Sequence, residues 1–239
     1  MAGDPYGRAI YDHHRGQRNA PLFAQDGEEV LEHPIEDFYF ADPSEEDDFR
    51  WLESWLSGPL LDVGAGAGRH TRYFQERFET VAIDVSDHLV TTMDERGIAD
   101  ARRVDMFDLR EAFDRGRFRS VLVHGTQLGL VGSRAGLRRV LCDLAAVTMS
   151  EATAVVDFYD PTRDDTRELL GYRDDPTPGL AYRVFHFEYE GDISETLLFR
   201  LFSPDRLREA TVGAGWEVAE IGRGSGEDDH YYRAALTKR

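Results

Sequence analysis

The sequence contains almost no cysteine and no long apolar run, and both absences limit what the protein can be. Cys142 is the only cysteine in 239 residues, so an internal disulfide is excluded and a reducing environment is expected. No apolar stretch approaches the roughly 20 residues that a membrane-spanning helix needs, and the first residues lack the basic-then-apolar pattern of a signal peptide. The eight histidines show no spacing with cysteines or carboxylates that is typical of a metal site. We therefore expect a soluble, cytoplasmic protein with no membrane partner and no bound metal.

Lysine is almost absent as well, because Lys238 is the only one and the other basic residues are arginines. The chain carries 46 acidic residues against 28 basic ones, and its formal net charge is −18. Such an excess repels itself in dilute salt, whereas at about 1 M salt the Debye length shrinks to ~3 Å. The composition resembles that of proteins from salt-in halophilic cells; a GC-rich genome would explain the arginines but not the acids. No basic stripe stands out, so nucleic acid is not an expected partner.

A short apolar run at residues 59–63 is followed by three alternating glycines, Gly64, Gly66 and Gly68. The run predicts a buried strand, and the glycines predict a turn where no side chain blocks a ligand that approaches the backbone. Residues 69–78 are then expected to form a helix. A second strand over 80–84 ends in Asp84, whose carboxylate suits a ribose with two hydroxyl donors. The pattern indicates that the chain binds a cofactor that contains a nucleoside.

The spacing of the glycines favours one such cofactor. A dinucleotide fingerprint, G-x-G-x-x-G, would place its third glycine at position 69, where this sequence has Arg69. The order D-V-G-x-G-x-G-R, with Asp62 inside the strand, resembles motif I of the class I S-adenosylmethionine-dependent methyltransferases. The resemblance implies S-adenosylmethionine as cofactor, with its amino-acid end on the glycine turn and its ribose on Asp84. On this resemblance the residues expected to contact the cofactor are Asp62, Gly64, Ala65, Gly66, Arg69, Asp84, Val85, Asp105, Met106 and His124.

Strands and helices alternate from residue 59 onward, which predicts a parallel sheet covered on both faces. Further strands are expected at 101–105, 119–125 and 153–158, and helices are expected to begin after the N-caps Ser86 and Ser133. The resemblance places Asp105 and Met106 beside the adenine; Asp105 could equally cap the turn that follows it. The expected fold class is α/β, a Rossmann-like doubly wound sheet that is mostly parallel.

The end of the chain supplies a second discriminating feature. Ser203 and Pro204 are typical of an N-cap followed by the first residue of a helix. Strands are then expected at 217–221 and 231–237, joined by an acidic, glycine-rich turn at 222–230. A helix, a strand and a returning antiparallel strand resemble the close of a methyltransferase sheet, where the last strand inserts into the sheet. Together with Arg69, this hairpin disfavours an NAD-dependent oxidoreductase.

Two segments fall outside the alternating pattern. Residues 1–56 are expected to form an N-terminal cap, irregular except for a helix over 49–56, ahead of a methyltransferase domain at 57–239. Tyr11 and Tyr39 are the cap residues best suited to close over a sulfonium cation. Residues 160–202 are expected to form an insertion with a β-hairpin, strands 180–189 and 194–202, near the acceptor site at the carboxyl edge of the sheet.

The chemistry is expected just after the fourth strand, in His124-Gly125-Thr126-Gln127. An N-P-P-Y motif, typical of amide or adenine nitrogen methylation, is absent there. His124 is the candidate general base, with a hydrogen-bonded structural histidine as the alternative. His70 and Arg72 could touch the cofactor carboxylate. The sequence predicts a methyltransferase for a small-molecule acceptor; the alternatives are a catalytically silent cofactor-binding protein and an aminopropyl transferase. The acceptor and the oligomeric state stay open.

Overall fold

The computed structural model describes residues 3–45, 49–223 and 230–238, and its centre is a seven-stranded sheet of order β12-β13-β7-β6-β3-β4-β5. The strands are β3 (Leu60–Val63), β4 (Thr80–Asp84), β5 (Ala101–Arg103), β6 (Phe118–Val123), β7 (Thr148–Tyr159), β12 (Trp216–Arg223) and β13 (Tyr231–Lys238). The pairs from β7 to β5 are parallel, whereas β13 runs antiparallel to both of its neighbours, β7 and β12. The expected fold class and the inserted last strand are confirmed; residues 224–229 of the expected turn lie outside the described residues.

Helices cover both faces of this sheet, as a doubly wound fold requires. They are α2 (Phe49–Trp55), α3 (Arg69–Phe74), α4 (Asp87–Glu95), α5 (Leu109–Ala112), α6 (Arg134–Val147) and α7 (Pro204–Thr211). Leu60, Leu122 and Val155 pack with α2 and α3 on one face, while the alternate strand residues pack with α5, α6 and α7 on the other. The two sets of strand side chains lie on opposite faces because successive residues of a strand point to opposite sides of the sheet.

The predicted N-caps are confirmed. The hydroxyls of Ser86, Ser133 and Ser203 accept hydrogen bonds from the first turns of α4, α6 and α7. Several boundaries differ from expectation. The helix α3 ends at Phe74 rather than 78, β5 ends at Arg103 rather than 105, β6 covers Phe118–Val123 rather than 119–125, and β11 begins at Leu197 rather than 194. The strand β7 begins at Thr148 rather than 153 and runs for 12 residues, because its N-terminal part continues directly from α6.

The expectation that the residues before the helix predicted at 49–56 are irregular is wrong. This segment forms α1 (Pro5–His14), β1 (Phe23–Asp26), β2 (Glu29–Glu32), the short π-helix η1 (Glu36–Phe40) and the short 3₁₀-helix η2 (Pro43–Glu45). The insertion forms η4 (Asp164–Glu168), β8 (Tyr172–Asp174), β9 (Leu180–Tyr189), β10 (Asp192–Ile193) and β11 (Leu197–Phe202). β1 pairs with β9 through Phe23 and Glu188, so both segments contribute to one second sheet. We call this sheet, together with the rest of residues 3–45, the cap.

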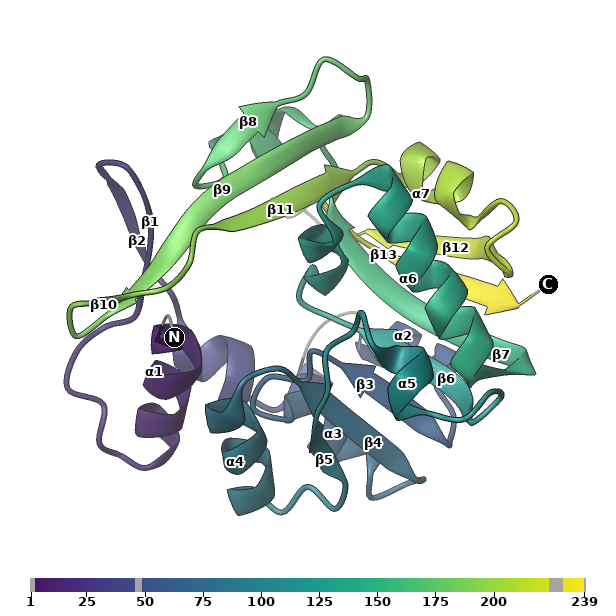
Figure 1. Cartoon of the computed structure of the whole chain (residues 1–239), viewed down its shortest axis with the longest axis horizontal. Coiled ribbons are helices and arrows are strands. Elements are labelled where there is room, and N and C mark those ends of the chain that lie inside the picture. Colours follow the sequence, from purple (N-terminus) through teal and green to yellow (C-terminus); the bar gives the residue numbers. More distant parts are fainter. Residues whose placement is uncertain (1–2, 46–48, 224–229, 239) are drawn as a thin grey trace.

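The cap lies over the carboxyl edge of the central sheet. In Figure 1 the long hairpin of β9 and β11 runs from the side of α7 toward α1, with β1 and β2 at its far end. Its apolar cluster includes Ile10, Leu22 and Phe187, and also Ala67 of the glycine turn and Leu89 of α4. The cap is therefore packed directly against the elements that surround the predicted cofactor site. No helix within the described ranges is long and apolar enough to cross a membrane.

Candidate active site

The glycine turn connects β3 to α3 in the conformation that the sequence predicts. Gly64, Gly66 and Gly68 have φ values of +67°, +59° and +73°, in the left-handed region that strains other residues. A β-carbon on Gly66 would lie 3.2 Å from the ring of Tyr39, and one on Gly64 would lie 2.8 Å from the side chain of Gln127. The turn thus presents main-chain atoms without side chains, and it is faced by Tyr39 of the leader and by Gln127 after β6.

Asp84 lies at the end of β4, beside this turn. Its Oδ2 accepts a hydrogen bond from the Gly66 amide at 3.1 Å, and its Oδ1 accepts one from the Ser86 amide at 3.0 Å. Burial raises the pKa of Asp84 to about 6, against the pull of these amide donors. Each carboxylate oxygen keeps a second lone pair, so Asp84 has the acceptor capacity that two ribose hydroxyls would use.

Asp62 and Arg69 hold the turn in place from two sides. Asp62 is buried and accepts a hydrogen bond from the Thr71 hydroxyl at 2.6 Å, which joins β3 to the first turn of α3. Burial raises the pKa of Asp62 to about 6. Arg69 Nε donates to the carbonyl of Ala41 at 2.7 Å, so its side chain reaches the cap. Arg72 is exposed on α3.

The remaining predicted cofactor residues lie along the same edge of the sheet. The amide of Ala65 donates to Ile83 at 3.0 Å, which ties the turn to β4, and Val85 is exposed beyond β4. Asp105 accepts a hydrogen bond from the Phe107 amide at 3.0 Å, the turn-capping alternative that the sequence left open. Met106 is packed into the main core cluster.

His124 and Asp157 form a hydrogen-bonded dyad at the ends of β6 and β7. His124 Nδ1 lies 2.7 Å from Asp157 Oδ2, so Nδ1 carries the proton and Nε2 is left as an acceptor. Asp157 is 1% exposed and also accepts hydrogen bonds from the amides of Gly125 and Thr126 and from the Tyr231 hydroxyl. The carboxylate is therefore saturated with donors, and it orients the imidazole of His124.

Electrostatics favour an ionised Asp157 beside this imidazole. Burial would raise the pKa of Asp157, but His124, the Tyr231 hydroxyl and the Gly125 amide outweigh burial and lower the pKa. The ring of His70 lies 4.5 Å from that of His124 in an edge-to-face arrangement. Burial lowers the pKa of His70 well below its usual value, and its Nε2 has no hydrogen-bond partner in the part of the chain that the structure describes.

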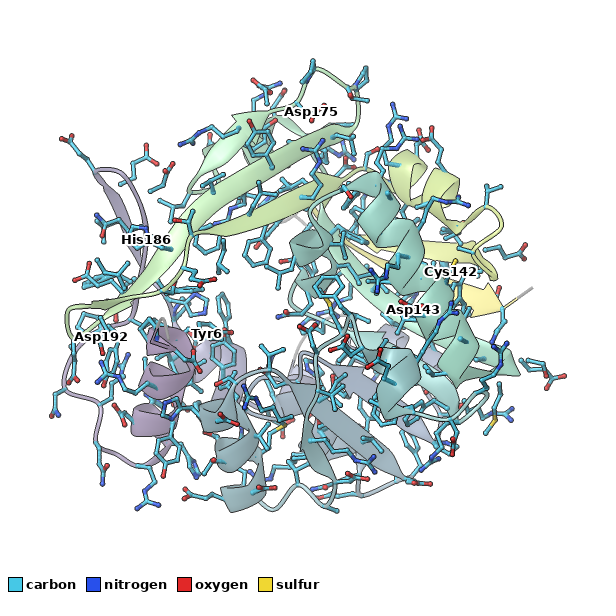
Figure 2. The ribbon with its side chains drawn as sticks, viewed as in Figure 1. Tyr6, Cys142, Asp143, Asp175, His186 and Asp192 are labelled. Atoms are coloured by element: carbon cyan, nitrogen blue, oxygen red, sulfur yellow. The ribbon has the colours of Figure 1, made fainter. Side chains whose placement is uncertain are left out.

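Of the two cap tyrosines singled out from the sequence, only Tyr39 lies on the glycine turn. The Tyr39 hydroxyl is 2.6 Å from the Tyr6 hydroxyl and 2.8 Å from His33 Nε2. In Figure 2 the side chain of Tyr6 extends from α1 toward the middle of the molecule. Tyr11 instead packs on His88 of α4, with ring centroids 5.8 Å apart. Tyr6, which the sequence had not indicated, therefore positions Tyr39 by a hydrogen bond between their hydroxyls.

Sequence reasoning also missed Asp157 and Tyr231. A usable signal existed for Asp157, since a lone carboxylate interrupts the apolar run of the fifth predicted strand. Tyr231 gave no such signal, because its contact with Asp157 depends on the insertion of β13 beside β7. Across the ranges that the structure covers, no three histidine, cysteine or carboxylate side chains are placed to hold a metal ion.

The comparisons with known proteins bear on this fold. No protein-family model matches the sequence, and no curated protein matches it either. Among solved structures, a SAM-dependent methyltransferase from Bacteroides fragilis in complex with S-adenosyl-L-homocysteine aligns with a TM-score of 0.78 at 24% identity, over 98% of this chain and 94% of that one. The CcbJ methyltransferase from Streptomyces caelestis aligns with a TM-score of 0.62 at 16% identity, over 85% and 96%.

A third neighbour is SAM-bound CalS10, an amino pentose methyltransferase from Micromonospora echinaspora. It aligns with a TM-score of 0.54 at 20% identity, over 75% of this chain and 83% of that one. These structures share the class I methyltransferase fold with this chain. At such identities the likeness establishes the fold, and the chemistry has to be argued from the site.

Proposed function

We propose that the chain is an S-adenosylmethionine-dependent methyltransferase that acts on a small-molecule acceptor. The observation that carries the proposal is the contact between the Asp84 carboxylate and the Gly66 amide, at the carboxyl ends of two neighbouring parallel strands. This is the edge of an open α/β sheet where ligands bind. The neighbour in complex with S-adenosyl-L-homocysteine, which aligns over nearly the whole chain, supports the choice of cofactor.

The residues present fit this cofactor. The cradle at Gly64 and Gly66 has no room for side chains, because added β-carbons would meet Gln127 and Tyr39. We assign the amino-acid end of the cofactor to this cradle, with Asp62, Ala65 and Arg69 shaping it. We assign the ribose to Asp84. The adenine is assigned to Val85, Asp105 and Met106 at the ends of β4 and β5.

When bound, S-adenosylmethionine supplies an electrophilic methyl group on a sulfonium, and S-adenosylhomocysteine is left after transfer. His124 Nε2 would accept the proton from the hydroxyl or amine of the acceptor and so leave the electron pair of that group available to the methyl carbon. Asp157 holds Nδ1–H and stabilises the imidazolium until its proton passes to water. The ring of Tyr39 faces the glycine turn, where an aromatic face favours a sulfonium cation.

We extend the proposal to the division of the chain. Residues 57–239 are the methyltransferase domain; in the leader at 1–56, β1 and β2 join the insertion at 160–202 in the cap sheet, whereas α2 packs on the central sheet. Because the cap packs on the glycine turn and lies over the strand ends, it is suited to exclude water from a small acceptor. The amino pentose acceptor named for CalS10 supports an acceptor of this size. Nucleic acid is not a proposed partner.

Calorimetric titration tests the cofactor. With the full chain in molar salt, S-adenosylhomocysteine is expected to give heat and NAD none. Heat from NAD alone would overturn the proposal. Binding by decarboxylated S-adenosylmethionine in preference to the intact cofactor would favour an aminopropyl transferase, which Asp157 disfavours because its four donors leave no place for a polyamine.

Transfer is tested with a labelled methyl donor and acceptor extracts. The wild type is expected to label an extract component, whereas His124→Gln is expected to bind S-adenosylhomocysteine normally and to transfer about 10²-fold more slowly or worse. Tight binding without any labelling by the wild type would indicate the silent binding protein instead.

A further inference from the structure

A narrow cleft lies between the cap hairpin and the strand ends that carry the proposed base. Its lining residues come from the loop after β6, the end of β7, and β9 and β11: Thr126, Gly129, Phe158, Tyr159, Arg183 and Arg200. Thr126 is two residues from His124 in the chain and donates its amide to Asp157. Tyr159 packs on Tyr231, which holds the same carboxylate. The cleft therefore adjoins the His124–Asp157 dyad.

Arg183 is the unusual residue in this cleft. Its Nε donates to the carbonyl of Leu170 at 2.8 Å, and its guanidinium lies 4.8 Å from the ring of Phe185 and 5.8 Å from that of Tyr159. Among the described residues, no carboxylate forms an ion pair with Arg183 and no group forms a hydrogen bond with its Nη1 or Nη2. Both terminal nitrogens are thus left for a ligand.

The neighbouring Arg200 has the ion pair that Arg183 lacks. It lines the same cleft and pairs with Asp175, which is labelled in Figure 2. The chain has 46 acidic residues against 28 basic ones, so a carboxylate is the commonest charged neighbour available. A half-buried guanidinium without such a neighbour carries a desolvation cost, and burial indeed lowers the pKa of Arg183. An anion in the cleft would offset this cost.

The surroundings select the kind of anion. Burial and then the charge of Arg183 lower the pKa of His33 to about 4, so His33 is neutral at neutral pH and adds no second cation. Arg200 is neutralised by Asp175. One uncompensated guanidinium with two free nitrogens matches the two oxygens of a single carboxylate, whereas a phosphate dianion would need a second cation. The rings of Phe158, Tyr159 and Phe199 supply apolar walls for the body of the ligand.

We propose that the methyl acceptor is a small carboxylic acid with an apolar or aromatic body, and that its carboxylate is bound by Arg183 while its nucleophilic group faces His124. This inference rests on the proposed function and names the substrate class of that same site. The open space in the cleft is only about 10 Å³, which is room for about one water molecule. Binding therefore requires the hairpin of β9 and β11 to move outward.

The test is a binding measurement with defined probes. Benzoate, phenylacetate and indole-3-acetate are titrated calorimetrically into the full chain with saturating S-adenosylhomocysteine, each beside its uncharged amide and beside phenyl phosphate. At least one acid is expected to bind more tightly than its amide and than phenyl phosphate. Arg183→Met is expected to weaken that acid about tenfold to a hundredfold and leave its amide unchanged. Arg183→Lys keeps the positive charge but loses the paired N–H donors of the guanidinium, so its affinity for the acid is expected to lie between those of the wild type and Arg183→Met.

The controls separate folding and function from the inference. Arg208→Met removes an exposed positive charge on α7, outside the cleft, and is expected to leave acid binding unchanged. Unaltered affinity of Arg183→Met for S-adenosylhomocysteine shows that the variant is folded. The inference is overturned if no acid binds better than its amide, if phenyl phosphate binds best, or if Arg183→Met binds the acid as the wild type does. Loss of S-adenosylhomocysteine binding by the wild type would instead overturn the proposed function.

Discussion

Replacing Asp84 by asparagine tests the cofactor site most directly. The substitution keeps the size of the side chain and one carbonyl acceptor but removes the negative charge beside Gly66. Hydrogen bonds to a charged group contribute about 1.5–3 kcal/mol each. If the ionised carboxylate receives the ribose hydroxyls, Asp84→Asn is expected to weaken S-adenosylhomocysteine binding about tenfold to a hundredfold at about pH 8.

The pH dependence gives the same prediction a second, independent form. Because burial raises the pKa of Asp84 to about 6, its ionised fraction rises as the pH passes that value. The wild type is therefore expected to bind S-adenosylhomocysteine about tenfold more weakly at about pH 5 than at about pH 8, with a plateau above about pH 7. Asp84→Asn is expected to lose this dependence. Asp62→Asn is the control for the pH dependence: it removes the other carboxyl whose pKa is raised to about 6, but because Asp62 faces Thr71, this variant is expected to keep the pH dependence whatever its affinity.

Stability is expected to move in the opposite direction from binding. A carboxyl whose pKa is raised in the folded state binds protons more tightly there, so its contribution to stability falls as the pH rises from about 4 to about 6. Asp84→Asn removes that cost at about pH 8 but also weakens the hydrogen bonds from the Gly66 and Ser86 amides. Because the two effects offset each other, its unfolding free energy is expected to stay within about 1 kcal/mol of the wild type. Calorimetry and urea unfolding measure the two quantities. Wild-type affinity in Asp84→Asn, or an affinity of the wild type that ignores pH, would refute the assignment of the ribose.

Three further predictions concern the rest of the site and the surface. Gly66→Ala is expected to lose about 1–2 kcal/mol of stability, because its backbone is left-handed, and also to weaken cofactor binding, because the new methyl group meets Tyr39. The control is Gly16→Ala, which has a φ of +66° but no described atom within 4 Å; thermal unfolding should show the same loss of stability, and calorimetry an unchanged cofactor affinity. Equal cofactor affinities of the two variants would contradict the assignment of the glycine turn to the cofactor. Asp157→Asn is expected to reduce kcat about 10²-fold or more without changing the affinity for S-adenosylhomocysteine, because His124 loses its orienting anion; an unchanged kcat would remove the dyad from the mechanism. The net charge of −18 predicts that the Tm rises as NaCl is raised to about 1 M, and a Tm that falls or stays level contradicts the halophilic interpretation.

The sequence by itself determined the features that depend on local spacing. The strands β3 and β4 were predictable from their apolar runs, and the glycine turn was predictable because the left-handed conformation at Gly64 and Gly66 favours glycine over side chains that would be strained there. The caps at Ser86 and Ser133 were predictable because a hydroxyl at that position satisfies an amide only three residues away. Asp84 was predictable because β4, which ends in it, follows the turn and α3 at the spacing of a β-α-β unit.

The tertiary structure decided which distant groups meet. β1 has only four residues, and a hairpin that short is marginal alone, so its existence depends on β9, far along the chain. The insertion of β13 beside β7 brings Tyr231 to Asp157, while the end of β6 brings His124 to it, and none of these pairings leaves a local pattern. The two terminal nitrogens of Arg183 that bond no described residue could not be predicted for the same reason. The sequence does not distinguish Arg183 from Arg200, and only the folded chain decides which of them meets a carboxylate.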